Sequence, residues 1–497
     1  MQDCVAVFDI GSNAVRLVIY DAADRSPVKI HNERSLCRLG KGVAATGRLN
    51  PDGIPAAMEA LTRFTMLAKK MGVRRHHAVA TAAIRLAKDG AAFLAQVKKE
   101  CGLDVRIIDG GEEARLSALG VMAGAAPGPF NGLIGDYGGG SLELLMIKDG
   151  RIRKKTSLPI GSGTLQDMTR PKRQETIETY LNDVPFLEDC KNMDLYALGG
   201  AWRAMAKAHM HMKNHPLSVV DRYTISGRQA SSFAQLIARQ SPKSLERAAK
   251  LSKGRIQDMS VAGIAMERLL HRIKPAHVVF SGTGLREGIL FDTLTPAQKK
   301  KDGLLATAHK YALQGSRFAK TTPLEKLAAW VLPLMNKDTP SRLITASCLL
   351  SDICCTVHED YQAEEAFRRI FIMPLYGISH EDRAFLALSQ YVRHRGYLRR
   401  ATRAKSADET TRPALALLDK SAADQAIILG LAQRLGYALS GGVPGLLTTS
   451  RWKVTLKKAT LHLNAQSALL NTGMAKDTLD ALGKAMDRTV SFAASQR

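Results

Sequence analysis

The 497-residue sequence predicts an α/β protein in which two related domains close over a cleft and a helical region follows. Three observations predict this class. A unit of strand, acid, glycine-containing turn and second strand occurs twice, at residues 7–20 and 134–147. Strand-like apolar runs alternate with helical periodicity up to about residue 300, and beyond it the strand signals fade. We therefore expect domains over residues 1–126, 127–300 and 301–497.

The first copy of the unit places Asp9 at the end of an apolar run, directly before Gly11, Ser12 and Asn13. This pattern predicts a β-hairpin whose tip is the size of a phosphate group. Glycine lets backbone N–H groups turn toward an anion, and the side chains of Ser12 and Asn13 add donors. An ordinary hairpin turn is the alternative, because glycine with Asn or Ser is common turn chemistry.

Between the two copies the pattern alternates. A helix is predicted over residues 54–71, a strand over 77–81, a second helix after it, and a short strand over 105–108. The breaker-rich residues 125–129 (Ala-Ala-Pro-Gly-Pro) mark the first domain boundary.

The second copy places Asp136 before a turn made of Gly138, Gly139, Gly140 and Ser141. Two such tips facing each other would hold a phosphate from both sides. Further along, Gly199-Gly200 and Ser281-Gly282 end two more apolar runs, where either anion or nucleotide binding or a plain tight turn is expected. After residue 300 the sequence predicts successive amphipathic helices, with one late strand-like piece at residues 452–463 that could form a small hairpin.

Hydrolysis of a phosphate ester or anhydride needs donors for the phosphoryl oxygens, a cation, and a carboxylate that activates water. Asp9 and Asp136 stand where a carboxylate could hold Mg²⁺ against phosphate, and Glu143 shares a strand face with Ser141. An acid in an apolar strand is costly unless it is used, so we favour a functional role for these three acids.

Other candidates are less specific on the residues alone. Glu113 follows a diglycine at an expected helix start, where interaction with the helix dipole is the simpler interpretation. Arg38 and Arg85 stand beside a turn and a strand end and could donate to phosphate oxygens. Isolated arginines are nevertheless more often surface residues.

The formal net charge of +25 predicts an acidic partner, for which nucleic acid, a membrane surface and polyphosphate all qualify. No apolar stretch is long enough to span a membrane, and the first residues lack the pattern of a secretion signal, so we expect a cytoplasmic protein. Seven scattered cysteines argue against a disulfide framework or a zinc site.

The chain resembles the Ppx/GppA family of exopolyphosphatases and guanosine pentaphosphate phosphohydrolases, within the actin-like, sugar kinase and Hsp70-type superfamily. The segments that carry the resemblance are residues 9–13, 38–40, 81–85, 111–115, 136–143 and 284–288. The resemblance implies two actin-like (ribonuclease H-like) domains around a cleft. More weakly, it implies an all-α, HD-like C-terminal region. HD domains that are phosphohydrolases need a His-Asp pair to hold a metal ion, and here the pair is Ser351-Asp352, so we expect the region to be non-catalytic.

The same resemblance assigns roles to residues. It implies that Glu113 is the catalytic base for water, that Glu143 is a catalytic acid associated with magnesium, and that Asp136 is a metal ligand, to which the strand pattern adds Asp9. The implied phosphate-binding residues are Gly11, Ser12, Asn13, Arg38, Arg85, Gly138, Gly139, Gly140 and Ser141.

These inferences predict a Mg²⁺-dependent, homodimeric exopolyphosphatase that releases terminal orthophosphate from inorganic polyphosphate. The basic residues expected to guide the polymer are Lys41, Arg393, Arg395, Arg399 and Arg400. The first alternative is hydrolysis of the 5′ γ-phosphate of guanosine pentaphosphate (pppGpp), alone or as a second activity. An actin-like ATPase or kinase is a more distant alternative. A basic nucleic-acid-binding module ranks last, because the chain is poor in the aromatic residues that stack on bases.

Overall fold

The computed structural model describes residues 3–240, 253–317, 324–396, 409–463 and 473–494. The chain divides into two compact units, Met1–Lys301 and Asp302–Arg497, each described here by itself. Within the described ranges, no helix combines the length and the apolar character that crossing a membrane requires.

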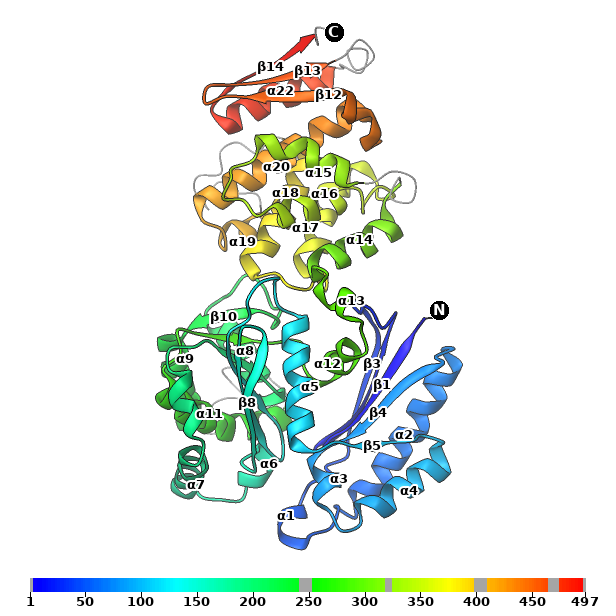
Figure 1. Ribbon diagram of the computed structural model, residues 1–497, viewed down its shortest axis with the longest axis vertical. Helices are drawn as coiled ribbons and strands as arrows, with labels where there is room; N and C mark the ends of the chain where they lie inside the picture. Colours follow the sequence, from blue (N-terminus) through cyan, green and yellow to red (C-terminus); the bar gives the residue numbers. More distant parts are fainter. Residues whose placement is uncertain (1–2, 241–252, 318–323, 397–408, 464–472, 495–497) are drawn as a thin grey trace. The chain divides into compact units, whose positions relative to one another are not determined.

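The first sheet of unit 1 has five strands in the order β3-β2-β1-β4-β5 (Figure 1). They are β1 (Val5–Ile10), β2 (Ala14–Tyr20), β3 (Lys29–Leu36), β4 (Arg75–Ala80) and β5 (Arg106–Ile107). Strand β1 runs antiparallel to β2 and parallel to β4. The accompanying helices are α1 (Val43–Thr46), α2 (Gly53–Lys70), α3 (Ala82–Leu86) and α4 (Gly90–Cys101). Buried side chains of α2 and α4, such as Leu61 and Val97, pack on one face of this sheet, and together they form the first lobe.

The second sheet has six strands in the order β10-β11-β9-β6-β7-β8. They are β6 (Gly132–Tyr137), β7 (Leu142–Lys148), β8 (Arg151–Leu158), β9 (Leu195–Leu198), β10 (Tyr223–Ser226) and β11 (His277–Phe280). Its helices are α6 (Ser162–Leu165), α7 (Arg170–Asn182), η1 (Pro185–Cys190), α8 (Gly200–Met212), α9 (Gly227–Arg239) and α11 (Lys253–Ile273). The order β8-β7-β6-β9 repeats β3-β2-β1-β4 with the same strand directions. This second lobe is therefore a structural duplicate of the first, as the repeated sequence unit predicts.

Two helices, α5 (Gly110–Ala123) and α12 (Leu285–Asp292), lie between the two sheets (Figure 1), and α13 (Pro296–Lys300) follows. Leu116 of α5 packs in the core of the first sheet, whereas Ala114 and Ala118 pack in the core of the second. The two helix backbones touch at glycine: a Cβ atom on Gly120 would lie 2.0 Å from the carbonyl oxygen of Gly284. This close packing holds α5 against the start of α12.

Unit 2 is helical over most of its length, as expected. Its helices are α14 (Gly303–Gly315), α15 (Glu325–Val331), η2 (Leu332–Leu334), α16 (Ser341–Leu349), η3 (Glu359–Tyr361), α17 (Gln362–Ile372), α18 (His380–Arg395), α19 (Arg412–Leu415), α20 (Lys420–Ser440), η4 (Pro444–Thr449) and α22 (Gly473–Met486).

The structure adds a three-stranded sheet to unit 2, so the region is not all-α. Its strands are β12 (Ser450–Val454), β13 (Lys458–Leu463) and β14 (Thr489–Ala494). The hairpin β12–β13 is the one expected from residues 452–463. Strand β14 pairs parallel to β13 after the intervening helix α22, a non-local pairing that the short sequence Thr-Val-Ser-Phe-Ala-Ala does not signal.

Candidate active site

The two glycine loops have the same turn geometry and lie against each other. The Gly11 N–H donates to the Ala14 carbonyl at 3.0 Å, and the Gly138 N–H donates to the Ser141 carbonyl at 2.9 Å. A Cβ atom on Gly140 would lie 3.4 Å from the Ser12 hydroxyl oxygen. The structure therefore brings the two predicted phosphate loops together.

Each loop is held from behind through its carbonyl oxygens. In the first lobe the backbone N–H of Arg38 donates to Asn13 at 3.0 Å, and that of Gly40 donates to Ser12 at 2.8 Å. In the second lobe the donors are the N–H groups of Ser162 and Gly163 and the Thr164 hydroxyl, which reach Gly138, Gly139 and Gly140 at 3.1, 2.8 and 3.0 Å. Because their carbonyls are bonded on one side, the loops can present N–H groups on the other. The segment 162–164 therefore supports the second loop from behind.

Replacing Thr164 by valine removes one of these supporting hydrogen bonds and preserves the side-chain shape. A neutral hydrogen bond contributes about 0.5–1.5 kcal/mol, so we expect a loss of roughly 2- to 10-fold in affinity for orthophosphate. Isothermal titration of orthophosphate measures it. Thr179→Val is the matched control, since among the described residues the Thr179 hydroxyl bonds the Glu175 carbonyl, within α7, and no group of the loops. Equal losses in both variants would contradict a supporting role for Thr164.

Two carboxylates of the second hairpin lie next to each other. Asp136 on β6 is the register partner of Glu143 on β7, and Ser157 on β8 follows in the same row. The Ser117 hydroxyl donates to Asp136 at 2.6 Å, and the Ser157 hydroxyl donates to Glu143 at 3.0 Å. Burial raises the pKa of both carboxyls, and for Glu143 the Asp136 charge raises it further. Each acid therefore lies where a cation would stabilise its charged form.

Glu113 joins this pair from helix α5. The helix begins at Gly110, and the Asp109 side chain caps it by accepting from the Glu112 N–H at 2.7 Å. The Glu113 carboxylate lies 3.4 Å from Arg85 Nη1, and Arg85 also donates to the Ile108 carbonyl at 2.6 Å. Burial, followed by the charges of Glu143 and Asp136, raises the pKa of Glu113 well above its ordinary value. A carboxylate with these neighbours accepts a proton readily.

Two arginines near Asp9, and a third near Arg286 and Asp136, were not predicted as site residues. Arg286 Nη1 lies 2.7 Å from Asp9 Oδ2, and Arg16 is the register partner of Asp9 on β2. Arg203 donates to the carbonyls of Ser281 and Thr283 at 2.7 and 3.1 Å. Burial, followed by the charge of Arg286, lowers the pKa of Arg16 to about 10. Cations gathered in this way favour an anionic ligand.

A signal for Arg16 was available in the repeat. Asp9 and Arg16 are seven positions apart, as are Asp136 and Glu143, so Arg16 occupies in the first hairpin the place of Glu143 in the second. Arg286 lies within the segment 284–288 that carries the family resemblance, but nothing local connects it with Asp9.

The residues of the site fit a magnesium ion that is shared with the substrate, but not one that is held by protein ligands alone. Carboxylate oxygens are the donors that Mg²⁺ prefers. Among the described residues, however, no three His, Cys, Asp or Glu side chains are grouped so as to hold a metal ion. The arrangement therefore fits an ion held by one or two carboxylates together with substrate phosphates, the usual mode for Mg²⁺, and not an all-protein cage.

The residues expected to guide a polymer are only partly at the surface. Lys41 and Arg395 are exposed, while Arg399 and Arg400 lie outside the described residues. Arg393 is only 8% exposed. Its guanidinium lies over the Tyr437 ring at 3.7 Å and 3.5 Å from Asp352 Oδ1. The structure thus contradicts a surface role for Arg393, because the aromatic ring and the carboxylate hold it inside unit 2.

In unit 2, the residues at the HD-like position, Ser351 and Asp352, form hydrogen bonds with other side chains of the same unit. Arg317 Nε and Nη2 donate to the two Asp352 carboxylate oxygens at 3.0 and 2.9 Å, and Ser351 hydrogen-bonds the Tyr437 hydroxyl at 2.9 Å. A guanidinium thus neutralises the acid that would otherwise be paired with histidine at a metal. That this region is non-catalytic remains a prediction.

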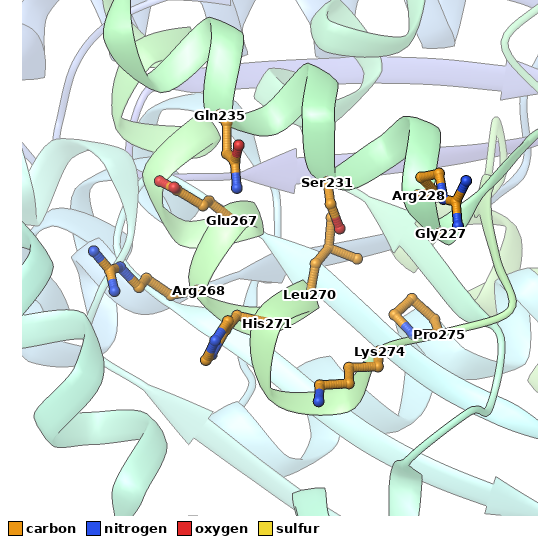
Figure 2. Close-up of a pocket in the computed structure, with 10 residues that line it drawn as sticks. All are labelled: Gly227, Arg228, Ser231, Gln235, Glu267, Arg268, Leu270, His271, Lys274 and Pro275. Atoms are coloured by element: carbon orange, nitrogen blue, oxygen red, sulfur yellow. The ribbon is translucent and has the colours of Figure 1, made fainter.

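A pocket of about 310 Å³ lies between α9 and α11. Figure 2 shows Arg228, Ser231 and Gln235 from α9 facing Glu267 and His271 from α11. None of the predicted site residues lines it, so this hollow is not the site built by the two loops.

The repeated sheet topology and the two facing loops define a two-lobed protein of the actin-like class. The chain belongs to the Ppx/GppA phosphatase family, whose model matches residues 18–297. A second family model, the exopolyphosphatase C-terminal region, matches residues 325–493. The two matches fall in units 1 and 2, respectively.

Curated relatives include exopolyphosphatases. Exopolyphosphatase 1 of Mycobacterium tuberculosis is 31% identical over 164 residues, covering 32% of this chain and 47% of that protein. The chain thus spans about half the length of this relative. Exopolyphosphatase 2 of the same organism is 27% identical over 295 residues, covering 54% of this chain and 91% of that protein. Retrograde regulation protein 2 of Saccharomyces cerevisiae is 24% identical over 444 residues, covering 78% of this chain and 72% of that protein.

Solved structures support the fold of unit 1. A Ppx/GppA family member from Aquifex aeolicus is 27% identical with a TM-score of 0.50, covering 58% of this chain and 97% of its own. An exopolyphosphatase from Cytophaga hutchinsonii is 23% identical with a TM-score of 0.54, covering 59% of this chain and 99% of its own. The second likeness concerns the fold alone.

Proposed function

We propose that this protein is a Mg²⁺-dependent exopolyphosphatase that removes terminal orthophosphate from inorganic polyphosphate. The observation that carries the proposal is the placement of Glu113, a buried carboxylate of raised pKa beside Asp136 and Glu143, in the lobe pair whose glycine loops face each other. The names of the mycobacterial relatives and the net charge of +25 support a polyanionic substrate. From the sequence alone we further propose a homodimer in the cytoplasm.

The loops and their neighbours would hold the terminal phosphate. In the described part of the chain, the N–H groups of Gly139 and Gly140 donate to no other residue, which leaves them available to phosphate oxygens. The side chains of Ser12, Asn13 and Ser141 add donors. Arg85, placed by the Ile108 carbonyl, would pair with an oxygen of the same phosphate.

Glu113 then supplies the base. Its carboxylate takes a proton from a water molecule as the water oxygen attacks the terminal phosphorus. The bond from that phosphorus to the bridging oxygen breaks, so that orthophosphate is released and the bridging oxygen stays on the shortened chain. Asp136 and Glu143, register partners on β6 and β7, would hold Mg²⁺ together with the substrate phosphates, and the ion when bound neutralises charge on the phosphate oxygens. Asp9, the third acid predicted as a metal ligand, pairs with Arg286 instead.

The structure gives less support to an ATPase or kinase. A Cβ atom on Gly199 would lie 2.1 Å from the Tyr137 carbonyl oxygen, so this glycine allows close packing of the backbone. The Gly282 N–H donates to Asp221 at 2.7 Å, and Arg203 bonds the Ser281 carbonyl. Both motifs that could have held a nucleoside are used inside the second lobe. The same loops could bind the terminal phosphate of pppGpp, which remains the alternative substrate.

The test is orthophosphate release in the presence of Mg²⁺ from long-chain polyphosphate, pppGpp and ATP, measured in parallel on the intact protein. We expect rapid release from polyphosphate. Orthophosphate release from pppGpp or ATP, without release from polyphosphate, would show that the nucleotide and not polyphosphate is the substrate.

Removing the metal is expected to stop the reaction. Treatment with EDTA should reduce orthophosphate release to background, and excess Mg²⁺ should restore it, because the carboxylates of the site and the phosphates of the substrate repel one another without a cation between them. The melting temperature measured with and without EDTA serves as the control for unfolding. Full activity after chelation would contradict the metal assignment.

A further inference from the structure

Within the described residues of unit 2, the three-stranded sheet has one covered face and one open face. On the covered face, Trp330 of α15 donates to the Ser450 hydroxyl at 2.9 Å and packs against Trp452 with ring centroids 5.4 Å apart. Ala459 and Leu461 of β13 are buried on the same face. Since successive side chains of a strand point to opposite faces, the alternate residues form the other face.

Strand register shows which residues share the open face. Arg451 pairs with His462, which pairs with Ala493. In the next row Lys453 pairs with Thr460, which pairs with Ser491, and Lys458 pairs with Thr489. The face is therefore built from basic and hydroxyl-bearing side chains.

Its positive charge is uncompensated within the described residues. Arg451, Lys453 and Lys458 are all exposed, and none of them forms an ion pair with another described residue. No Asp or Glu belongs to the rows of the face. Residues two apart on a strand are about 6.6–6.8 Å apart and neighbouring strands about 4.8 Å apart, so the cations form a compact group.

We propose that this open face, defined by Arg451, Lys453, Lys458 and His462, binds inorganic polyphosphate away from its reacting end. The inference rests on the proposed function. The cations would pair with successive phosphates of the polymer, and the hydroxyls of Thr460 and Ser491 would donate to its oxygens. Arg393, which the sequence predicts to guide the polymer, is buried, so polymer binding is assigned to this sheet.

The chemistry of the face favours polyphosphate over single-stranded nucleic acid. Proteins that bind single strands stack bases on aromatic side chains. The aromatic residues of this sheet, Trp452 and Phe492, alternate with the open-face residues and so belong to the covered face. Lysine on an edge strand can also protect against strand pairing, which could explain Lys453 on β12. It does not explain Lys458 and His462, which lie on the central strand β13.

The test uses the full chain with Arg451→Gln, Lys453→Gln and Lys458→Gln combined. The matched control combines Lys337→Gln, Lys476→Gln and Lys484→Gln, which removes the same charge from exposed positions elsewhere in unit 2. Binding of end-labelled long-chain polyphosphate is followed by fluorescence anisotropy at several salt concentrations with EDTA present, so that turnover does not consume the probe.

We expect the open-face variant to bind about tenfold more weakly and to reduce the slope of log Kd against log salt by about 2, by analogy with single-stranded nucleic acids. The control variant should keep both values. With Mg²⁺ added, hydrolysis of tripolyphosphate, in which few phosphates extend beyond the one held by the glycine loops, should stay within twofold of wild type in both variants.

Equal effects of the two triple variants, or unchanged binding in the open-face variant, would overturn the proposal. So would a loss of binding to single-stranded RNA without a loss of polyphosphate binding. The result is separable from the proposed activity: a wild-type protein that binds polyphosphate through this face without hydrolysing it would support the face and reject the exopolyphosphatase. A wild-type protein that does not bind polyphosphate at all would reject both.

Discussion

Replacing Glu113 by glutamine is expected to slow orthophosphate release from polyphosphate by about 10²- to 10⁴-fold, the contribution typical of a positioned general base. Glutamine has the same size and shape as glutamate and can still form hydrogen bonds, but its amide does not accept a proton from water. Polyphosphate binding should persist, because the loops and Arg85 remain. Steady-state phosphate release and polyphosphate binding, measured on the same preparation, separate the two effects.

Glu112→Gln is the matched control for this substitution. Glu112 is the preceding residue of α5, and Arg115 donates to its two carboxylate oxygens at 2.7 and 2.9 Å. Its carboxylate thus belongs to a different contact from that of Glu113. We expect Glu112→Gln to retain activity. A Glu113→Gln protein as active as wild type would assign water activation to another residue, of which Glu143 is the first to test.

The second large effect concerns stability. Glu287 at the start of α12 is 2% exposed and accepts from Tyr20 at 2.8 Å and from the Gly284 N–H at 2.9 Å. Lys29 Nζ lies 2.7 Å from the same carboxylate. Glu287 is buried but Lys29 is exposed, so water can solvate part of the positive charge that Glu287→Gln would leave unpaired. We therefore expect the substitution to lower the free energy of unfolding of unit 1 by about 1.5–3 kcal/mol at neutral pH, the range for a hydrogen bond to a charged group. Urea unfolding of the full chain, followed by tryptophan fluorescence, measures it.

The same residue gives a pH dependence. Burial opposes ionisation of Glu287, but the charges of Lys29 and Arg286 outweigh it and hold the pKa of that carboxyl well below its ordinary value. A depressed carboxyl pKa stabilises the fold above the unfolded-state pKa of about 4.3, and this stabilisation is lost as the pH falls through the folded-state value. Wild-type stability should therefore fall more steeply below about pH 4 than that of Glu287→Gln.

Glu188→Gln provides the comparison, because Glu188 is an exposed residue paired with Lys191. It should leave both the unfolding midpoint and its pH dependence close to wild type. If Glu287→Gln and wild type lose stability in parallel as the solution is acidified, Glu287 is not the group responsible.

The sequence was sufficient to predict features that depend on local pairing. The two hairpins, their glycine tips and the acids Asp9 and Asp136 are specified within segments of about fifteen residues, since alternation and turn chemistry act over that range. The duplication then predicted that the tips belong together, and the strand orders of the two sheets confirm the duplication.

Features that depend on distant packing could not be predicted in this way. By its neighbours in sequence, Glu113 is an acid at a helix start. It comes close to Asp136 and Glu143 because α5 lies against β8, where a Cβ atom on Gly110 would lie 2.9 Å from Ser157. The Asp9–Arg286 pair joins residues 277 positions apart. Arg393 failed as a surface residue because burial beneath Tyr437 is set by the packing of α18 on α20, not by its basic neighbours in sequence.

The hydrogen bonds behind the two glycine loops also bear on repeated turnover. A peptide unit of the loop cannot rotate its carbonyl toward a bound phosphate without breaking a bond to the segments 38–40 or 162–164. The donors are thus oriented when the chain folds, and little reorganisation is left for the moment of binding. An enzyme that shortens a polymer by one phosphate at a time meets that step again after every release, so the advantage of rigid loops recurs along the whole length of the substrate.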